Sequence, residues 1–202
     1  MVGSQFRSAS IAVSRICAFL LWAFALACAF SAVDSHALTP SEAYKVLGKR
    51  QTTYDARQSK LPPAQAQALQ ELLTLYDKAV VQRAQITLFL RTDGAEGRPL
   101  SAYDGALAEL ATKLDFVPLE KDLLPIRELV TRALEEQQQY FHSIVRGRER
   151  DFYEFKASRA HPMVQSASKK LRRAYDMLML TYSSESAHNK RAFGDHFAAL
   201  DF

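Results

Sequence analysis

Apolar residues spaced three and four apart along long stretches are the feature that most constrains this chain. In the stretch 164–182, seven apolar positions share one stripe, and lysines and arginines occupy the other side. This spacing is typical of a helix that packs on a core by one face. No stretch shows sustained alternation rich in valine, isoleucine and threonine, which is the pattern of a strand. The sequence therefore predicts an all-α fold, a helical bundle of five or six mostly antiparallel helices.

Proline and capping signals set the expected starts of the first helices. Residues 39–42 (Thr-Pro-Ser-Glu) combine an N-cap hydroxyl, a first-turn proline and a glutamate three residues later, so a helix should begin at Thr39. A second should begin at residues 61–63 (Leu-Pro-Pro) and end in the apolar run 86–90, which we expect to be buried. Residues 92–99 are the clearest loop. The apolar face expected for the first helix consists of Ala43, Val46, Leu47 and Tyr54.

The longest helix is expected from about residue 119 to residue 158. Pro125 complicates its start, because proline is tolerated in a first turn and breaks a helix interior. The helix proper therefore begins near Leu124 or is kinked there, and a bend near residues 146–148 is a further expectation. A new helix should follow the His161-Pro162 break, and a last short helix should run over residues 189–202 with phenylalanines on one side.

Residues 1–37 have the three zones of a secretory signal peptide. Two arginines precede an uncharged apolar run at residues 16–30, and residues 35–37 (Ser-His-Ala) supply the small side chains that a signal peptidase reads. We therefore expect cleavage after Ala37 and a mature chain of residues 38–202, folded as a single helical domain. The expected location is the periplasm or the outside of the cell.

Two alternatives to simple cleavage stay open. Residues 25–28 (Ala-Leu-Ala-Cys) form a loose lipobox, in which case Cys28 would carry a lipid as the first residue. An uncleaved leader is the other alternative, because residues 16–33 are nearly long enough to span a bilayer. Either outcome would anchor the same domain to a membrane.

Composition restricts how the mature chain is held together. Both cysteines, Cys17 and Cys28, lie in the leader, so the expected mature chain has neither a disulfide nor a thiol nucleophile. Loss of residues 1–37 removes two arginines and one aspartate, which lowers the formal net charge from +4 to +3. The only asparagine, Asn189, is not part of a glycosylation motif, so the composition favours a bacterial periplasm.

The C-terminal third is basic and carries clustered aromatic residues. If the helices that bear the cations are neighbours, they form a patch for an acidic protein or an anionic component of the cell envelope, with contact to a membrane surface and no role for nucleic acid. The alternative is a solvated face with scattered ion pairs and aromatic side chains packed in the core. The expected binding surface consists of Phe152, Tyr153, Phe155, Arg146, Arg148, Lys169, Arg172 and Arg173.

An alternative hypothesis is a metal site. Glu185 lies three residues before His188, which places both on one helical face, as in di-metal carboxylate bundles. Such bundles need a second pair, and the matching position before His142 holds Gln139. We therefore expect no cofactor and interpret these histidines first as ordinary hydrogen-bonding groups. The candidate metal ligands are Glu185, His188, His196 and His142.

The sequence contains none of the short catalytic motifs that announce a reaction. It has no His-Glu-x-x-His, no Gly-x-Ser-x-Gly, no phosphate-binding glycine loop and no Cys-x-x-Cys. The adjacent pair Glu135-Glu136 diverges around a helix, which argues against a shared acid–base role. We expect a binding role, as an adaptor, chaperone-like factor or structural accessory, rather than an enzyme.

Two short strings resemble, in part, the Leu-Thr-x-x-Gln helix starts of small periplasmic helical chaperones. They are residues 38–42 (Leu-Thr-Pro-Ser-Glu) and residues 61–65 (Leu-Pro-Pro-Ala-Gln). Each covers five residues and lacks one position of the pattern, so the strings indicate the class of exported helical chaperones or adaptors and do not assign the family.

Overall fold

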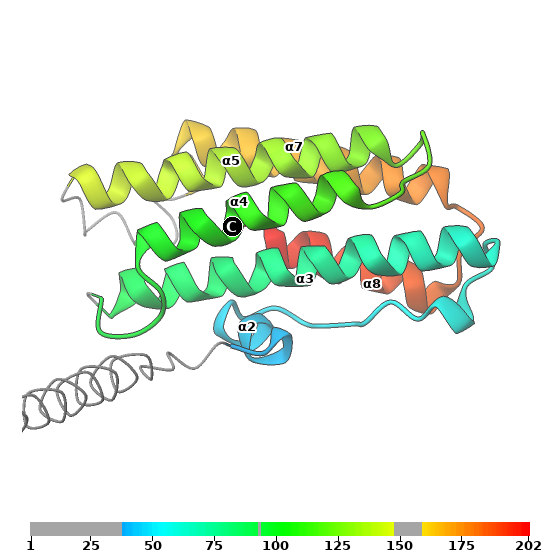
Figure 1. Ribbon diagram of the computed structural model, residues 1–202, viewed down its shortest axis with the longest axis horizontal. Helices are drawn as coiled ribbons and strands as arrows, with labels where there is room; N and C mark the ends of the chain where they lie inside the picture. The colour runs from blue at the N-terminus through cyan, green and yellow to red at the C-terminus, as the bar shows by residue number, and fades with distance from the viewer. Residues whose placement is uncertain (1–37, 93, 148–158) are drawn as a thin grey trace, which may run out of the picture. The chain divides into compact units, whose positions relative to one another are not determined.

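The computed structural model describes residues 38–92, 94–147 and 159–202. These residues form six α-helices, one short 3-10 helix and no strand, which confirms the predicted all-α helical bundle (Figure 1). The elements are α2 (Pro40–Val46), η1 (Ala56–Gln58), α3 (Pro63–Arg91), α4 (Leu100–Phe116), α5 (Leu124–Gly147), α7 (Pro162–Thr181) and α8 (Ala187–Leu200).

Residues from Leu38 to Phe202 cluster as one compact unit. None of the helices in the described ranges has the length and apolar character needed to cross a membrane. The expected signal peptide, the lipobox at Cys28 and the cleavage after Ala37 lie outside the described residues and stay predictions.

The start of α2 is confirmed at the predicted capping sequence. The Thr39 hydroxyl accepts from the Glu42 backbone N–H, and the Glu42 carboxylate accepts from the Thr39 N–H at 2.8 Å, which completes a capping box. The helix ends after seven residues because Gly48 adopts a φ of 64°, the left-handed conformation that closes a helix. Tyr54 is therefore not on its face as predicted, although it is buried in the segment that follows.

α3 begins at Pro63, as the double proline predicts, and leads into the predicted loop before α4. In that loop Gly97 has a φ of 79°, and a Cβ there would lie 2.2 Å from the Gln85 carbonyl oxygen, so the close turn requires glycine. The expected burial of residues 86–90 holds for Ile86 and Thr87 and is only partial for residues 88–90.

α5 begins at Leu124, which agrees with the prediction that the helix proper begins there and places Pro125 in its first turn. The start expected near residue 119 is thus wrong by five residues. α3, with 29 residues, is also longer than the 24 residues described for α5. The expected continuation over residues 148–158, and with it most of the expected bend, lies outside the described residues.

α7 follows the predicted break at His161-Pro162. The His161 ring Nδ1 accepts from the backbone N–H of Met163 at 3.3 Å and acts as the N-cap. Five members of the predicted stripe are buried within the helix, while Tyr175 is only partly buried and Tyr182 serves as the C-cap. The five are Val164, Ala167, Leu171, Ala174 and Leu178.

α8 lies against α3 and α7 and buries a wider face than the single apolar side that the sequence predicts, with an exposed side at Ala187, Arg191 and Ala198. Its phenylalanines are buried as predicted, but three polar residues, Asn189, Asp195 and His196, are buried as well. Burial of these groups is tolerated because each has a hydrogen-bond partner from another part of the chain.

Two buried side chains satisfy the last carbonyl groups of α8. Arg83 of α3 donates to the Ala199 carbonyl, and Gln137 of α5 donates to the Leu200 carbonyl at 2.6 Å. The end of a helix carries unpaired carbonyls and a partial negative charge, so a buried arginine is favourable there. α8 is thereby tied to both α3 and α5.

Candidate binding groove

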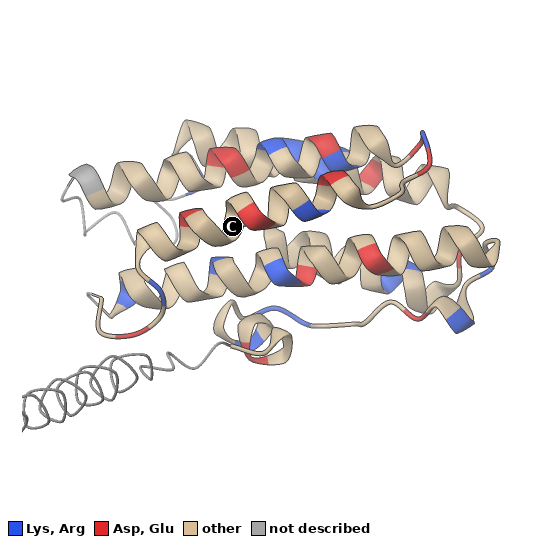
Figure 2. Ribbon diagram, viewed as in Figure 1, with Lys and Arg blue, Asp and Glu red and all other residues tan. Residues whose placement is uncertain are grey.

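A groove lies between α5 and α7 and has a volume of about 550 Å³. We refer to it as the α5–α7 groove. It combines cationic side chains with partly buried apolar ones, and Figure 2 shows basic and acidic residues interspersed along these two helices. Its lining consists of Pro125, Glu128, Leu129 and Arg132 from α5, and Ser166, Lys169, Lys170, Arg173 and Met177 from α7.

The register of the two helices is fixed by a polar cluster at one end of the groove. Glu136 of α5 accepts from Ser166 at 2.9 Å and from Lys170 at 2.7 Å, and these partners lie in the first half of α7. At the other end, Pro125 from the start of α5 and Met177 from near the end of α7 line the same groove. The spacing of residues on each helix then brings Arg132 and Arg173 into the section between.

The groove carries an excess of positive charge. The Lys170 ammonium is half-buried and neutralised by Glu136, and Arg132 pairs with Glu128 across one exposed helical turn at 2.6 Å. Exposed pairs of this kind are weak and are easily exchanged for another anion. Within the described residues, Lys169 and Arg173 form no ion pair, and both side chains are exposed. These two cations are therefore available to a ligand.

The structure divides the predicted binding surface. Lys169 and Arg173 lie one turn apart in the α5–α7 groove, but Arg172 borders a different furrow, between α7 and α8, that also contains Asp201. Arg146 belongs to α5, and its side chain is not described. Residues 148–158, which include Arg148, Phe152, Tyr153 and Phe155, lie outside the described residues, so their part in the surface stays a prediction.

The sequence analysis included Arg146 of this long helix in the expected surface but missed the α5 residues that line the groove. Arg132, Leu129 and Pro125 come from a helix that is some forty residues away in sequence from its partner. The Glu128–Arg132 spacing marks a solvated helical face, but it does not show that this face lies beside Lys169 and Arg173. Only the packing of α5 on α7 brings the two sets together.

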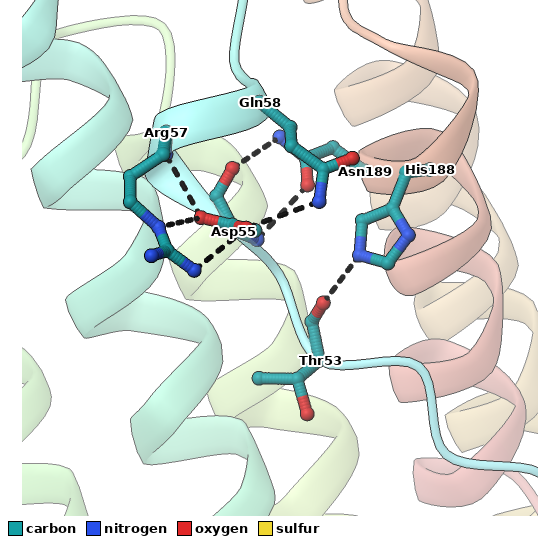
Figure 3. A network of polar contacts seen from close by, with 6 residues as sticks. All are labelled: Thr53, Asp55, Arg57, Gln58, His188 and Asn189. Atoms are coloured by element: carbon teal, nitrogen blue, oxygen red, sulfur yellow. Dashed lines mark hydrogen bonds and ion pairs between the residues drawn. The ribbon is translucent and has the colours of Figure 1, made fainter.

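The four candidate metal ligands are held by separate partners. His142 Nε2 lies 3.0 Å from both carboxylate oxygens of Asp104, and His196 Nε2 lies 3.1 Å from Asp77. His188 Nε2 lies 3.0 Å from the Thr53 carbonyl oxygen (Figure 3). In the described ranges no three or more His, Cys, Asp or Glu side chains form a group that could hold a metal ion. The predicted set is thus not brought together.

Glu185 and two α8 residues instead anchor the segment 48–60, which we call the strap. Glu185 accepts from the Tyr54 hydroxyl at 3.1 Å, from the Ser59 hydroxyl and from the Lys60 backbone N–H. Asn189 exchanges two hydrogen bonds of 3.0 Å with the backbone of Asp55 (Figure 3). This second pattern mimics a backbone pairing and fixes the strap against the start of α8.

The third anchor is Asp195, which accepts a forked pair of bonds from Arg50 at 2.9 Å and one from Thr52 at 2.6 Å. Burial opposes ionisation of Asp195 and of Glu185. The hydrogen bonds to the charged carboxylates outweigh that effect and lower the pKa of both groups. The strap is therefore anchored by ionised carboxylates that accept hydrogen bonds from it, and Arg50 and Arg57 are paired with carboxylates. Lys49 and Lys60 of the strap form no ion pair among the described residues, but they lie outside the α5–α7 groove.

A larger hollow of about 970 Å³ lies where η1, the start of α3 and the end of α4 meet. Ala66 and Leu75 are buried in its floor, and Phe116 stands at its edge with 82% of its surface exposed. Its two cations are already paired, Arg57 with Asp55 and Lys113 with Glu109. Its one lining carboxylate, Glu71, is exposed and accepts from Gln67 at 3.2 Å, so this hollow has apolar surface but, among its described residues, no cation left to bind an anion.

Comparisons with known proteins add no relative: no protein family, curated protein or solved structure matches this chain.

Proposed function

We propose that this chain is an exported, non-enzymatic binding protein and that the α5–α7 groove receives an anionic partner. The observation that carries the proposal is the pair Lys169 and Arg173, two exposed cations one turn apart that form no ion pair among the described residues and line a concave surface. The signal-like leader supports export, and the anions of a cell envelope include acidic proteins and lipid headgroups.

The groove favours binding over catalysis because its described lining presents cations but no side chain placed to act as a general acid or base. Among the described residues that line the groove, Glu128 is the only carboxylate, and it is exposed and paired with Arg132. The same described lining contains no histidine, cysteine or tyrosine. A cationic surface of this kind steers and holds an anion, and its affinity falls as salt screens the charges.

Adjacent arginines on α7 allow a matched test. The full chain should bind poly-L-glutamate at low ionic strength, measured by titration calorimetry, and bind it more weakly as salt is added. Arg173→Glu should weaken binding about tenfold, because loss of an attraction and gain of a repulsion together change the binding free energy by about 1.4 kcal/mol. Arg172→Glu makes the same charge change outside the groove and should have an effect of about threefold or less.

Two results would contradict the proposal. Equal weakening by the two variants would exclude the groove as the binding site, and absence of binding to poly-L-glutamate would exclude an anionic partner.

Export is tested separately by the intact mass of the protein recovered from its own envelope. Recovery of the unprocessed chain from the cytosol, or stoichiometric metal in protein purified without a histidine tag, would contradict the exported, metal-free binding role.

A further inference from the structure

The α5–α7 groove changes character along its length. Its central section is cationic, with Arg132, Lys169 and Arg173, whereas Leu129 and Met177 provide partly buried apolar surface beside it. Beyond Met177, on the same face of α7, Leu180 has 77% of its surface exposed. The positions 173, 177 and 180 follow one another at helical spacing, so cation and apolar surface form a continuous stripe.

Apolar surface is also present at the start of α5. Pro125 lines the groove at the same end as Met177, and its neighbour Leu124 is exposed on 40% of its surface. Arg173 and Leu180 are seven residues apart, which corresponds to about 10 Å along the helix axis. The groove therefore offers an anion-binding section and an apolar section within the length of one small molecule.

We infer that the α5–α7 groove binds a single-chain anionic lipid. Its acidic headgroup lies among Arg132, Lys169 and Arg173, and its hydrocarbon chain runs over Leu129 and Met177 toward Leu180. This inference rests on the proposed binding role of the groove and names the ligand class.

Two properties of the groove favour this occupant. A volume of about 550 Å³ falls within the range of small-ligand sites, and such sites combine apolar lining with a few placed polar groups. A free inorganic anion would leave Met177 and Leu129 without a partner, and a wholly polar acidic peptide would do the same. The aliphatic stems of the lysine and arginine side chains extend the apolar lining while their charged ends reach the headgroup.

The test is a chain-length series with the full chain, using titration calorimetry below the concentration at which micelles form. The probes are acetate, octanoate and dodecanoate, with dodecyltrimethylammonium as a probe that has the same tail and the opposite charge. A fully buried methylene changes affinity about fourfold, so in this open groove we expect a gain of at least about twofold for each added methylene. Dodecyltrimethylammonium should bind at least about tenfold more weakly than dodecanoate.

Two pairs of variants locate the ligand. Arg173→Gln should weaken dodecanoate binding and Arg172→Gln should not, because only the first residue lines the groove. Met177→Gln should reduce the dependence on chain length, whereas Met163→Gln, at a partly buried methionine of the same helix that does not line the groove, should leave it unchanged. Helical circular dichroism and the unfolding midpoint of each variant check that the fold is retained.

The outcomes separate this inference from the proposed function. If poly-L-glutamate binds at Arg173 but dodecanoate binds no better than acetate, the lipid inference is overturned and the anionic groove stands. If neither binds, both are overturned. Binding to vesicles of anionic phospholipid without binding to monomeric dodecanoate would also overturn the inference, in favour of a membrane surface. Equal binding of the two dodecyl probes would overturn the assignment of the headgroup to the cations.

Discussion

The strap over α8 and the groove between α5 and α7 are both rich in charged residues, and they differ in where those charges find partners. In the strap, Arg50 is held by Asp195, and Glu185 accepts hydrogen bonds from three groups of the same segment. In the groove, Lys169 and Arg173 reach solvent without an ion pair among the described residues. Charges that are satisfied within the fold contribute to stability, whereas exposed charges of one sign are available to a partner.

The predicted metal ligands and the predicted cations lie in surroundings that differ in the same way. Glu185 and His196 come from a part of the chain where burial demands partners, so the fold itself uses their polar atoms. Lys169 and Arg173 come from the solvated face of α7, where no residue in the described ranges pairs with their charge. The same residue types thus stabilise the fold in one region and can recognise a ligand in the other.

The largest effect is expected from removing the aromatic contact between strap and α8. Phe193 is fully buried and stacks on Tyr54 with ring centroids 5.8 Å apart. Phe193→Ala should lower the free energy of unfolding by about 4 kcal/mol, because it removes a large buried side chain and leaves a cavity. Phe116→Ala, at a ring that is 82% exposed, should change it by about 0.5 kcal/mol or less.

Urea unfolding followed by helical circular dichroism measures both variants. Similar losses in the free energy of unfolding for Phe193→Ala and Phe116→Ala would show that the strap is not packed on α8 as described. The distinction between a strap anchored to the fold and a groove with available charges would then not hold.

A smaller effect is expected from pH. The pKa values of Glu185 and Asp195 in the fold are below their ordinary values of 4.5 and 3.8, because hydrogen bonds to the charged carboxylates outweigh the opposing effect of burial. The unfolded chain therefore binds protons more readily than the fold. The stabilisation is complete above the ordinary pKa values and is lost as the pH falls through the lowered ones.

Unfolding measurements from neutral pH down to pH 3 should show stability declining below about pH 4.5, the ordinary pKa of a glutamate. Glu185→Gln should make this decline shallower, and Glu135→Gln, at an exposed carboxylate of α5, should leave the slope unchanged. A slope that is the same in the parent chain and in Glu185→Gln would contradict the view that the strap is held by ionised groups.

The smallest effect on stability is expected in the groove. Lys169→Ala and Arg173→Ala should each change the free energy of unfolding by about 0.5 kcal/mol or less, since neither cation has an ion pair with a described residue to lose. Lys170→Ala should lower the free energy of unfolding by about 1 kcal/mol more than either of these two variants, because it leaves the half-buried Glu136 carboxylate without its cation. If Lys169→Ala were the most destabilising of the three in urea unfolding, its charge would belong to the fold and not to a ligand.

Local sequence signals predicted the helix starts well and the partners of each helix poorly. The capping box at Thr39, the prolines at 62–63 and the His161-Pro162 break all act within one turn of the chain, and each begins a helix where expected. The end of α2 was missed because Gly48 adopts a left-handed conformation, which brings Tyr54 off the helix and into the strap. The buried sides of α8 were missed because their polar residues resemble a solvated face until their partners are known.

The sequence by itself determined the all-α class, the positions at which most helices begin, and the stripe that α7 buries, because these depend on spacing and on contacts within a few residues. Tertiary structure alone decided that Arg132 of α5 lies in one groove with Lys169 and Arg173, that Arg172 lies outside it, and that Glu185 belongs to the strap. The physical reason is that such contacts join residues far apart in the chain. They are fixed by which helix faces pack together, and local spacing does not specify that choice.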